Sequence, residues 1–216
     1  MAARLIVGVT GASGSALALE TLRQLGAAGV ETHLVVTPGA RLTVAHELGS
    51  DGLARLGDAA AHVHSPRNLA APIASGSFRT AGMIVVPCSM RSLAAMAHGL
   101  GDNLLTRAAD VVLKEKRRLV VAPREAPLHE GHLEAMLKLA RLGALIAPPV
   151  PPFYARPATM DDLVREIAAR LVQWAGIDPG DRMTRWGDGD IAPRAPDAEV
   201  PSGCGSPRRR PGSSIP

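Results

Sequence analysis

Residues 4–15 read R-L-I-V-G-V-T-G-A-S-G-S, a short apolar run followed by a turn rich in glycine and serine. A run of Leu, Ile and Val without polar alternation is typical of a strand that is buried on both faces. Glycines placed directly after such a strand allow a tight turn into a helix. The stretch therefore predicts a buried parallel strand, a turn and a helix.

The same pattern recurs along the chain. Apolar runs predict strands at Leu5–Val9, Thr32–Val36, Met83–Val86, Leu119–Ala122 and Ala144–Ala147. Segments with helical periodicity lie between and after them, at Gly14–Ala28, Ala40–Leu48, Ser92–His98, Leu104–Lys116, His129–Leu142 and Met160–Trp174. Alternating strands and helices imply right-handed crossovers and helices on both faces of the sheet. We expect one α/β domain with a doubly wound, Rossmann- or flavodoxin-like parallel sheet.

The composition sets the boundaries and the class of the protein. A chain of 216 residues fits a single domain, which we place at residues 1–187. Residues 188–216 turn to Pro, Gly, Ser and Arg, so we expect a disordered tail. Aromatic residues make up only 2% of the chain, which disfavours nucleic-acid binding by base stacking. The apolar runs are too short to cross a membrane, and the two cysteines suggest no disulfide framework, so we expect a cytoplasmic protein.

Polar residues follow the first and third predicted strands. Ligands of open parallel sheets bind at the carboxyl ends of the strands, where this chain carries Thr10–Ser15 and Ser89–Ser92. We expect both loops to face one crevice. The amides at the helix start favour phosphate binding, although glycine-rich turns also occur for packing reasons alone.

The loops favour a mononucleotide over a dinucleotide. After Gly8, Gly11 and Gly14 the next position in that spacing is Leu17, and the second strand ends without the acid that grips a ribose hydroxyl. FMN needs only phosphate and ring contacts and fits better. Thr37, directly after that strand, is a candidate hydroxyl donor or an ordinary helix cap.

Three blocks of the sequence are specific. P-C-S-M-R-S-L-A-A-M-A-H-G (87–99), the segment 102–128 that ends in P-R-E-A-P-L, and G-A-L-I-A-P-P-V-P-P-F-Y (143–154) resemble the flavin prenyltransferase (UbiX-type) family. The resemblance runs from Leu5 to about Trp186. It implies transfer of a dimethylallyl group from dimethylallyl phosphate to N5 and C6 of reduced FMN without a metal. It also implies a homo-oligomer, with a dodecamer as one candidate, a flavin reductase as electron source, and a UbiD-type decarboxylase that receives the prenylated FMN.

The resemblance also assigns residues. Flavin contacts are implied for Gly11, Ala12, Ser13, Thr37, Ser89, Met90, Arg91, Ser92 and Arg124. Binding of the prenyl phosphate is implied for Arg107, Lys114, Tyr154, Arg170 and Trp186. Catalytic roles are implied for Ser13, Glu47, Lys114 and Glu125, with Glu125 as the proton-handling acid. Leu69 stands where many members carry an aromatic residue.

The chemistry asks for these residue types independently. Expelling phosphate from an allylic carbon leaves a cation and a dianion, so fixed Arg and Lys charges lower the barrier. No metal site is predicted: His129 and His132 lie three apart, without a third ligand in pattern.

Two other readings stay open. A flavin-dependent decarboxylase acting on cysteine or phosphopantothenoylcysteine shares this fold and would use a histidine such as His46, but the P-R-E-A-P-L block weighs against it. A non-catalytic flavin storage or subunit-interaction protein would bind FMN without needing Lys114, Tyr154 and Arg170 together.

Overall fold

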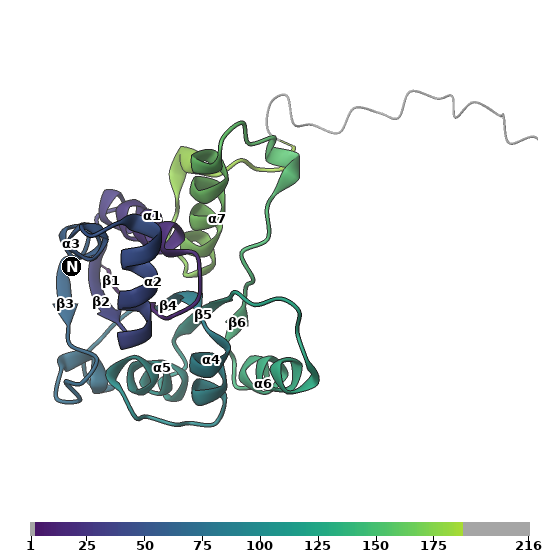
Figure 1. The fold of residues 1–216 in the computed structure, drawn as a ribbon. Coiled ribbons are helices and arrows are strands. Elements are labelled where there is room, and N and C mark those ends of the chain that lie inside the picture. The colour runs from purple at the N-terminus through teal and green to yellow at the C-terminus, as the bar shows by residue number, and fades with distance from the viewer. Residues whose placement is uncertain (1–2, 188–216) are drawn as a thin grey trace, which may run out of the picture.

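The computed structural model describes residues 3–187, which form one parallel six-stranded sheet covered by helices (Figure 1). The strands are β1 (Arg4–Val9), β2 (Glu31–Val36), β3 (His62–His64), β4 (Gly82–Cys88), β5 (Arg118–Pro123) and β6 (Leu145–Ile146). Their order is β3-β2-β1-β4-β5-β6, so the chain builds outward from β1 on one side, returns, and builds outward on the other. The predicted doubly wound sheet is confirmed.

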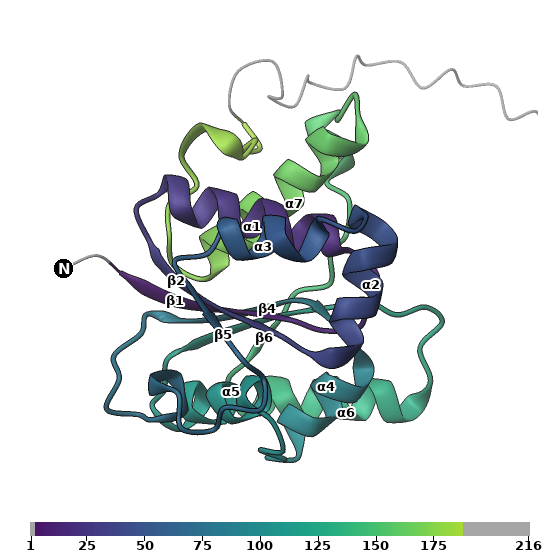
Figure 2. The same ribbon diagram turned by 60° about the vertical axis from the view of Figure 1, so that its left-hand side comes forward.

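Helices cover both faces of this sheet. They are α1 (Ser15–Ala27), α2 (Pro38–Leu48), α3 (Gly52–Asp58), α4 (Met90–Ala97), α5 (Leu104–Lys114), α6 (Glu130–Arg141) and α7 (Met160–Trp174). Figure 2 shows α1, α3 and α7 above the sheet and α4, α5 and α6 below it. No helix among residues 3–187 is both long and apolar enough to cross a membrane.

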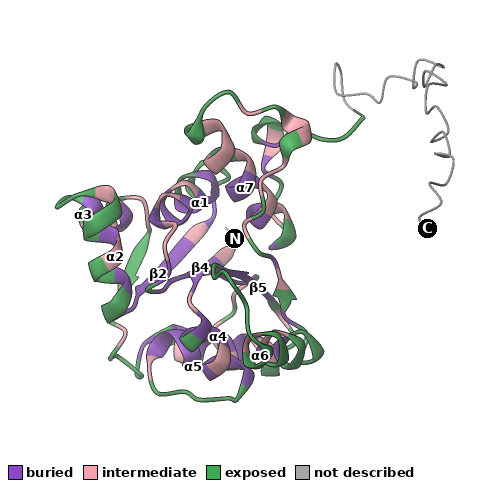
Figure 3. Cartoon of the chain, turned by 45° about the vertical axis from the view of Figure 1, so that its right-hand side comes forward, coloured by how far each residue is buried: buried purple, intermediate pink, exposed green. Residues whose placement is uncertain are grey.

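The four central strands, β2, β1, β4 and β5, contribute side chains to two cores. Leu5, Val7 and Val9 of β1 pack in the cluster that contains α1 and α7, whereas Ile6 packs with residues of α4 and α5 on the other face. This double burial explains why the strands lack polar alternation. In Figure 3 the central strands are accordingly buried, while the outer side of α6 is exposed.

Two elements were not predicted. Helix α3 spans only seven residues, and β3 spans three, of which two are exposed. Neither carries an apolar run or enough turns to show a period. The residues H-V-H form the strand β3 because they pair in parallel with β2.

Some predicted boundaries were wrong by a few residues. Strand β4 continues through Pro87 to Cys88, with a register shift after Val85. Helix α4 begins at Met90 because Ser89 is its N-cap. Gly14 lies before α1 with φ of 121°, a conformation that disfavours other residues. The predicted start of α7 is confirmed, with Thr159 as N-cap. The predicted tail, residues 188–216, lies outside the described residues.

Candidate functional site

A crevice opens where the strand order reverses, between the carboxyl ends of β1 and β4. It encloses about 450 Å³ and is lined by Gly11, Thr37, Pro38, Gly39, Ser89, Arg91, Ser92, Asp102 and Asn103. The lining comes from the loops after β1, β2 and β4, as expected for an open parallel sheet. The prediction that the two polar loops face one crevice is confirmed.

Thr10 joins these two loops. Its hydroxyl donates to the carbonyl oxygen of Pro87 at 2.9 Å and accepts from the N–H of Ser89 at 2.6 Å. Its own N–H donates to the same Pro87 carbonyl oxygen at 3.2 Å. Because Thr10 is buried, these bonds are shielded from water and fix the two strand ends side by side.

Two hydroxyls in the crevice also cap helices. The Thr37 hydroxyl accepts from the N–H of Ala40 at 3.3 Å and donates to the Val9 carbonyl oxygen at 3.2 Å. The Ser89 hydroxyl accepts from the N–H of Ser92 at 3.4 Å and donates to the Ser92 hydroxyl at 3.2 Å. Both alternatives weighed for Thr37 therefore coexist: it caps α2 and it lines the crevice. Each hydroxyl oxygen still has a lone pair for a ligand.

The backbones of two loops approach closely at the crevice floor. A Cβ added to Gly11 would lie 3.2 Å from the carbonyl carbon of Gly39. The two glycines therefore leave room at the floor that side chains would fill. A narrow floor with hydroxyls at helix starts suits the phosphate and ribityl part of a mononucleotide.

Glu47 occupies the start of α1. Its carboxylate accepts from the N–H of Gly14 at 3.0 Å and from the N–H of Ser15 at 2.7 Å. Our expectation that these amides are free for phosphate is therefore wrong. The reason is tertiary, since α2 brings Glu47 from 33 positions away along the chain. The hydroxyls that line the crevice are instead those of Thr37, Ser89 and Ser92.

The pKa of Glu47 lies below its usual value. Burial alone would raise this pKa, but hydrogen bonds from the Ser13 side chain and from the Ser15 and Gly14 amides lower it. The structure thus brings Ser13 and Glu47, both predicted as catalytic, into contact.

Two of the residues that were predicted to contact the flavin, Ala12 and Met90, are buried.

Acid is expected to weaken this cap. A pKa lowered in the folded state contributes stability above the unfolded value of 4.5, and the contribution is lost as the pH falls through the folded value. The thermal midpoint of the wild type should therefore exceed that of Glu47→Gln at about pH 6.5 and approach it at about pH 3.5. If the difference in thermal midpoint between the wild type and Glu47→Gln were the same at both pH values, this account of the cap would be wrong.

Arg124 and Glu125 lie beside a second hollow. It has a volume of about 300 Å³ and is bounded by residues 123–126 and 148–150. The N–H of Arg124 donates to the Cys88 carbonyl oxygen at 3.0 Å, which ties this loop to the end of β4. The Glu125 carboxylate accepts from the N–H of Ala126 at 3.0 Å. Both side chains are exposed.

Tyr154 and Arg170 line a third hollow, and Trp186 packs on Tyr154. Tyr154 and Arg170 line a cavity of about 430 Å³ between the loop after β6 and helix α7. The Tyr154 and Trp186 rings pack edge to face with centroids 5.6 Å apart. The Arg170 guanidinium lies 5.7 Å from the centre of the Trp174 ring. Three residues predicted to bind the prenyl phosphate are therefore neighbours.

Two of these hollows lie at the carboxyl edge of the sheet. The crevice follows β2, β1 and β4, and the Arg124 hollow follows β5, so the strand order places these two in a row. The Tyr154 cavity lies instead along α7, whose last residue, Trp174, accepts from Arg118 at the start of β5. Pro148 and Val150 line both the second and the third hollow and so connect them.

Lys114 and Arg107 do not join this row within one chain. Lys114 ends α5, four residues before β5 begins, so it lies at the opposite, amino edge of the sheet. Its ammonium pairs with Glu115. Arg107 is held on α5 by Asp110, with Nη1 2.7 Å from Oδ2, and donates to the Ala74 carbonyl oxygen at 3.3 Å.

Two further predicted positions are exposed. Arg91 reaches the crevice but pairs with Asp102, whose Oδ2 lies 3.1 Å from its Nη2. Leu69 is half exposed on the loop between β3 and β4.

Sequence reasoning missed several residues of the crevice. Gly39 and Asn103 were not singled out, although each stands next to a predicted loop or helix start. The Asn103 side chain caps α5 by accepting from the N–H groups of Leu105 and Thr106. An Asn directly before an apolar periodic run is a recognised start signal and would have identified it.

The comparisons with known proteins agree with this architecture. The family profile described as Flavoprotein matches residues 2–172. The chain is 50% identical over 174 residues to a probable UbiX-like flavin prenyltransferase of Bacillus subtilis, covering 81% of this chain and 85% of that protein. It is 50% identical over 183 residues to the flavin prenyltransferase UbiX of Neisseria meningitidis, covering 84% and 95%.

Solved structures give the same result. The crystal structure of AnUbiX (PadA1) in complex with FMN and dimethylallyl pyrophosphate has a TM-score of 0.83 and 44% identity, covering 86% of this chain and 98% of that one. A dodecameric FMN-dependent UbiX-like decarboxylase from Escherichia coli O157:H7 has a TM-score of 0.80 and 46% identity, covering 85% and 98%. A phosphopantothenoylcysteine (PPC) decarboxylase, at 20% identity and a TM-score of 0.56, shares the fold alone.

Proposed function

The chain belongs to the UbiX-type family of flavin prenyltransferases, and from that membership we propose that it prenylates reduced FMN with dimethylallyl phosphate. The enzyme is a transferase. The observation that carries the proposal is the crevice at the carboxyl edge of the sheet, where Thr37, Ser89 and Ser92 stand at helix starts, together with a separate cavity that Arg170 and Tyr154 line.

We assign the crevice to FMN. The Thr37, Ser89 and Ser92 hydroxyls and the adjacent helix starts would hold its phosphate, because they line the crevice and offer hydrogen-bonding groups to an anion. When bound, reduced FMN supplies the ring whose N5 and C6 receive the prenyl group. Arg124 would lie against that ring, since its loop is fixed to the end of β4.

We assign the Arg170 cavity to the prenyl phosphate. A guanidinium and a phenol hydroxyl offer several donors to phosphate oxygens. The cavity is otherwise lined by Pro148, Val150, Phe153, Ile167, Leu171 and other apolar groups, which would shield the allylic carbon from water. Fixed cationic charges there would stabilise the departing phosphate, so the proposed reaction uses no metal ion.

Proton transfer is assigned to two separate groups. Ser13 lies in the turn after β1 and hydrogen-bonds the Glu47 carboxylate. This pair would move a proton at N5 of the flavin. Glu125, on the next loop along the row, would handle the proton of the leaving phosphate.

Lys114 and Arg107 would act in the site of a neighbouring subunit. Within one chain Lys114 lies at the wrong edge of the sheet to reach the crevice. Apolar side chains exposed on α6 and on the loop after β6, namely Leu133, Leu137, Val150 and Phe153, support a homo-oligomer. The dodecameric relative from Escherichia coli makes twelve subunits the proposed assembly.

A mixing experiment tests this sharing of residues. Lys114→Ala and Glu125→Gln should each be inactive alone. Oligomers mixed from both should regain activity at about a quarter of their sites, because a random site draws each intact residue independently. Mixed Arg124→Ala and Glu125→Gln chains are the control, since these neighbouring residues serve one site. If oligomers mixed from Lys114→Ala and Glu125→Gln chains were no more active than either variant alone, Lys114 would not act in a neighbouring site.

The proposed partners follow from the reaction. A flavin reductase would supply reduced FMN, and a UbiD-type decarboxylase would take up the prenylated product. We propose the cytoplasm as the place where all three meet, and residues 1–187 as the domain that binds FMN.

The direct test is to incubate the purified protein with reduced FMN and dimethylallyl phosphate and to weigh the extracted flavin by mass spectrometry. We expect the mass of one added five-carbon prenyl unit, unchanged by a metal chelator. An unaltered flavin mass would contradict the proposal. Release of carbon dioxide from phosphopantothenoylcysteine would favour the decarboxylase instead, and tight FMN binding without either reaction would indicate a storage protein.

A further inference from the structure

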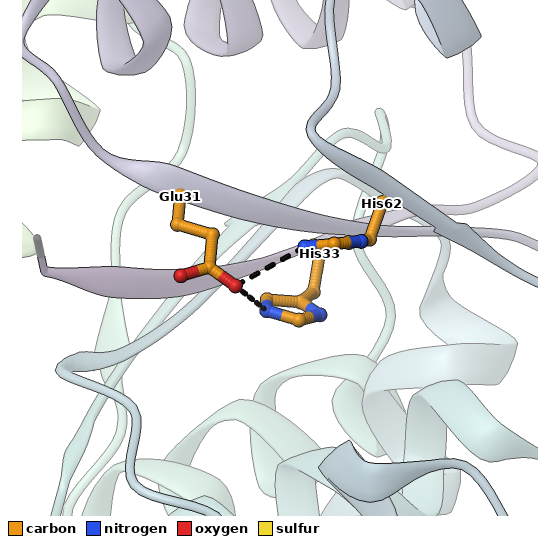
Figure 4. A group of neighbouring side chains, drawn as sticks. All are labelled: Glu31, His33 and His62. Carbon is orange, nitrogen blue, oxygen red and sulfur yellow. Dashed lines mark hydrogen bonds and ion pairs between the residues drawn. The ribbon is translucent and has the colours of Figure 1, made fainter.

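A cluster of histidines lies at the amino end of the sheet, away from the flavin crevice. Glu31 and His33 are two apart on β2, so their side chains share one face. His62 of the edge strand β3 is the register partner of His33, which places both on that face. Figure 4 shows the Glu31 carboxylate and the two imidazole rings pointing toward one another.

The distances suit a shared cation. Oε1 of Glu31 lies 3.1 Å from Nε2 of His62 and 3.5 Å from Nε2 of His33. One ligand atom from each of the three residues falls within 4.8 Å of the others. Ligand atoms at the usual zinc distance and tetrahedral angles lie about 3.4 Å apart. The His33 and His62 rings are stacked with centroids 4.7 Å apart, so the half-exposed His62 side chain would turn to bring both nitrogens onto one ion.

His33 supplies the second, independent observation. The residue is only 3% exposed, and its Nε2 atom is buried without a hydrogen-bond partner. Unpaired buried polar atoms are rare and call for an explanation such as an ion.

The surroundings orient the three ligands. The Nδ1 atom of His33 lies 3.0 Å from Nε2 of His64, and with Nδ1 as the donor the lone pair of His33 falls on Nε2. Arg4 donates from Nε to Oε2 of Glu31 at 3.0 Å, which leaves Oε1 available. Such outer hydrogen bonds are typical of metal ligands.

The cluster also has a wall and an entrance. The Phe78 ring packs edge to face on His33, with centroids 5.2 Å apart. The His62 side chain is 51% exposed and gives an ion access from solvent. Imidazole and carboxylate together suit borderline divalent cations.

We propose that Glu31, His33 and His62 bind one divalent transition-metal cation, represented by Zn²⁺, and that this ion fastens the edge strand β3 to β2. The proposal departs from the prediction that the chain holds no metal. It leaves the proposed prenyl transfer free of metal, because the crevice lies at the carboxyl edge and the cluster at the amino end of the same strands.

The sequence carried a signal for this cluster. E-T-H at 31–33 places two ligands two apart, and H-V-H at 62–64 places the ligand His62 two residues from His64, the hydrogen-bond partner of His33; two residues is the spacing of one strand face. The second segment was not predicted as a strand, so the two were never brought together.

The test is a zinc titration of the full, chelator-stripped protein against a chromophoric competitor. We expect one tight equivalent per chain. The affinity should fall about 100-fold or more in His62→Ala, which removes a ligand, and about 10-fold in His64→Ala, which removes only an outer hydrogen bond. The control is His129→Ala, because His129 stacks on His132 with centroids 3.5 Å apart but belongs to no three-ligand group among residues 3–187.

Two further readouts keep the result independent of folding defects. Cobalt should give a visible absorption band with the wild type that is absent in His62→Ala, and zinc at about 100 times its dissociation constant should raise the wild-type thermal midpoint by about 5 °C or more. No bound zinc in the wild type, or equal binding by His62→Ala, would overturn the proposal. Loss of binding only in His129→Ala would overturn it too.

Discussion

Replacing Glu125 by glutamine is expected to slow prenyl transfer by about 100-fold or more while FMN remains bound, because a proton-transfer group contributes on that scale. The substitution keeps the size of the side chain and removes its ability to exchange a proton. Glu125 lies in the hollow between the crevice and the Arg170 cavity and is exposed, so the fold should tolerate the change. Single-turnover kinetics and flavin titration measure the two effects separately.

The matched control for this variant is Glu134→Gln. Glu134 is an exposed acid on α6 and lines none of the three hollows. It should leave both rate and flavin affinity unchanged. If Glu125→Gln turned over at the wild-type rate, proton handling would have to be assigned to another group.

Arg170→Ala is expected to weaken the apparent affinity for dimethylallyl phosphate by about 10- to 100-fold, since a charged hydrogen bond contributes about 1.5–3 kcal/mol. Flavin affinity should change little, because Arg170 lines the third hollow and not the crevice. Arg170→Lys should recover part of the loss, as a lysine keeps the charge but not the fork of donors. The measurement is the substrate dependence of the initial rate.

Arg165→Ala provides the comparison on the same helix. Arg165 pairs with Asp162, Nη1 lying 3.0 Å from Oδ1, and an exposed pair of this kind contributes little to stability. An equal loss of affinity in both variants would indicate a general effect of charge. If Arg170→Ala left the apparent affinity for dimethylallyl phosphate unchanged, Arg170 would not belong to the phosphate site.

The strands and the crevice could be predicted because their signals are local. A strand buried on both faces reads as an apolar run, as β1, β4 and β5 do, and β2 does so only from Leu34 to Val36. A parallel sheet then fixes where the following loops lie, so Gly11 and Ser89 could be placed in one crevice without further information.

Features that depend on distant pairings could not be read in this way. The Glu47 carboxylate takes the amides that a phosphate was expected to use, and nothing in the turn after β1 announces this. Lys114 matches the family by sequence, but only the direction of α5 shows that it lies at the other edge of the sheet. The Glu31, His33 and His62 cluster depends on the pairing of β3, a strand too short to recognise.

The most direct test of the account is a crystal structure of the assembled protein with reduced FMN and a non-reactive analogue of dimethylallyl phosphate. The account predicts the flavin phosphate against Thr37 and Ser89 and the analogue's phosphate between Arg170 and Tyr154, near the flavin ring. It also predicts Lys114 of a neighbouring subunit beside that second phosphate. A flavin bound elsewhere, or an Arg170 cavity separated from the ring in the complete assembly, would contradict it.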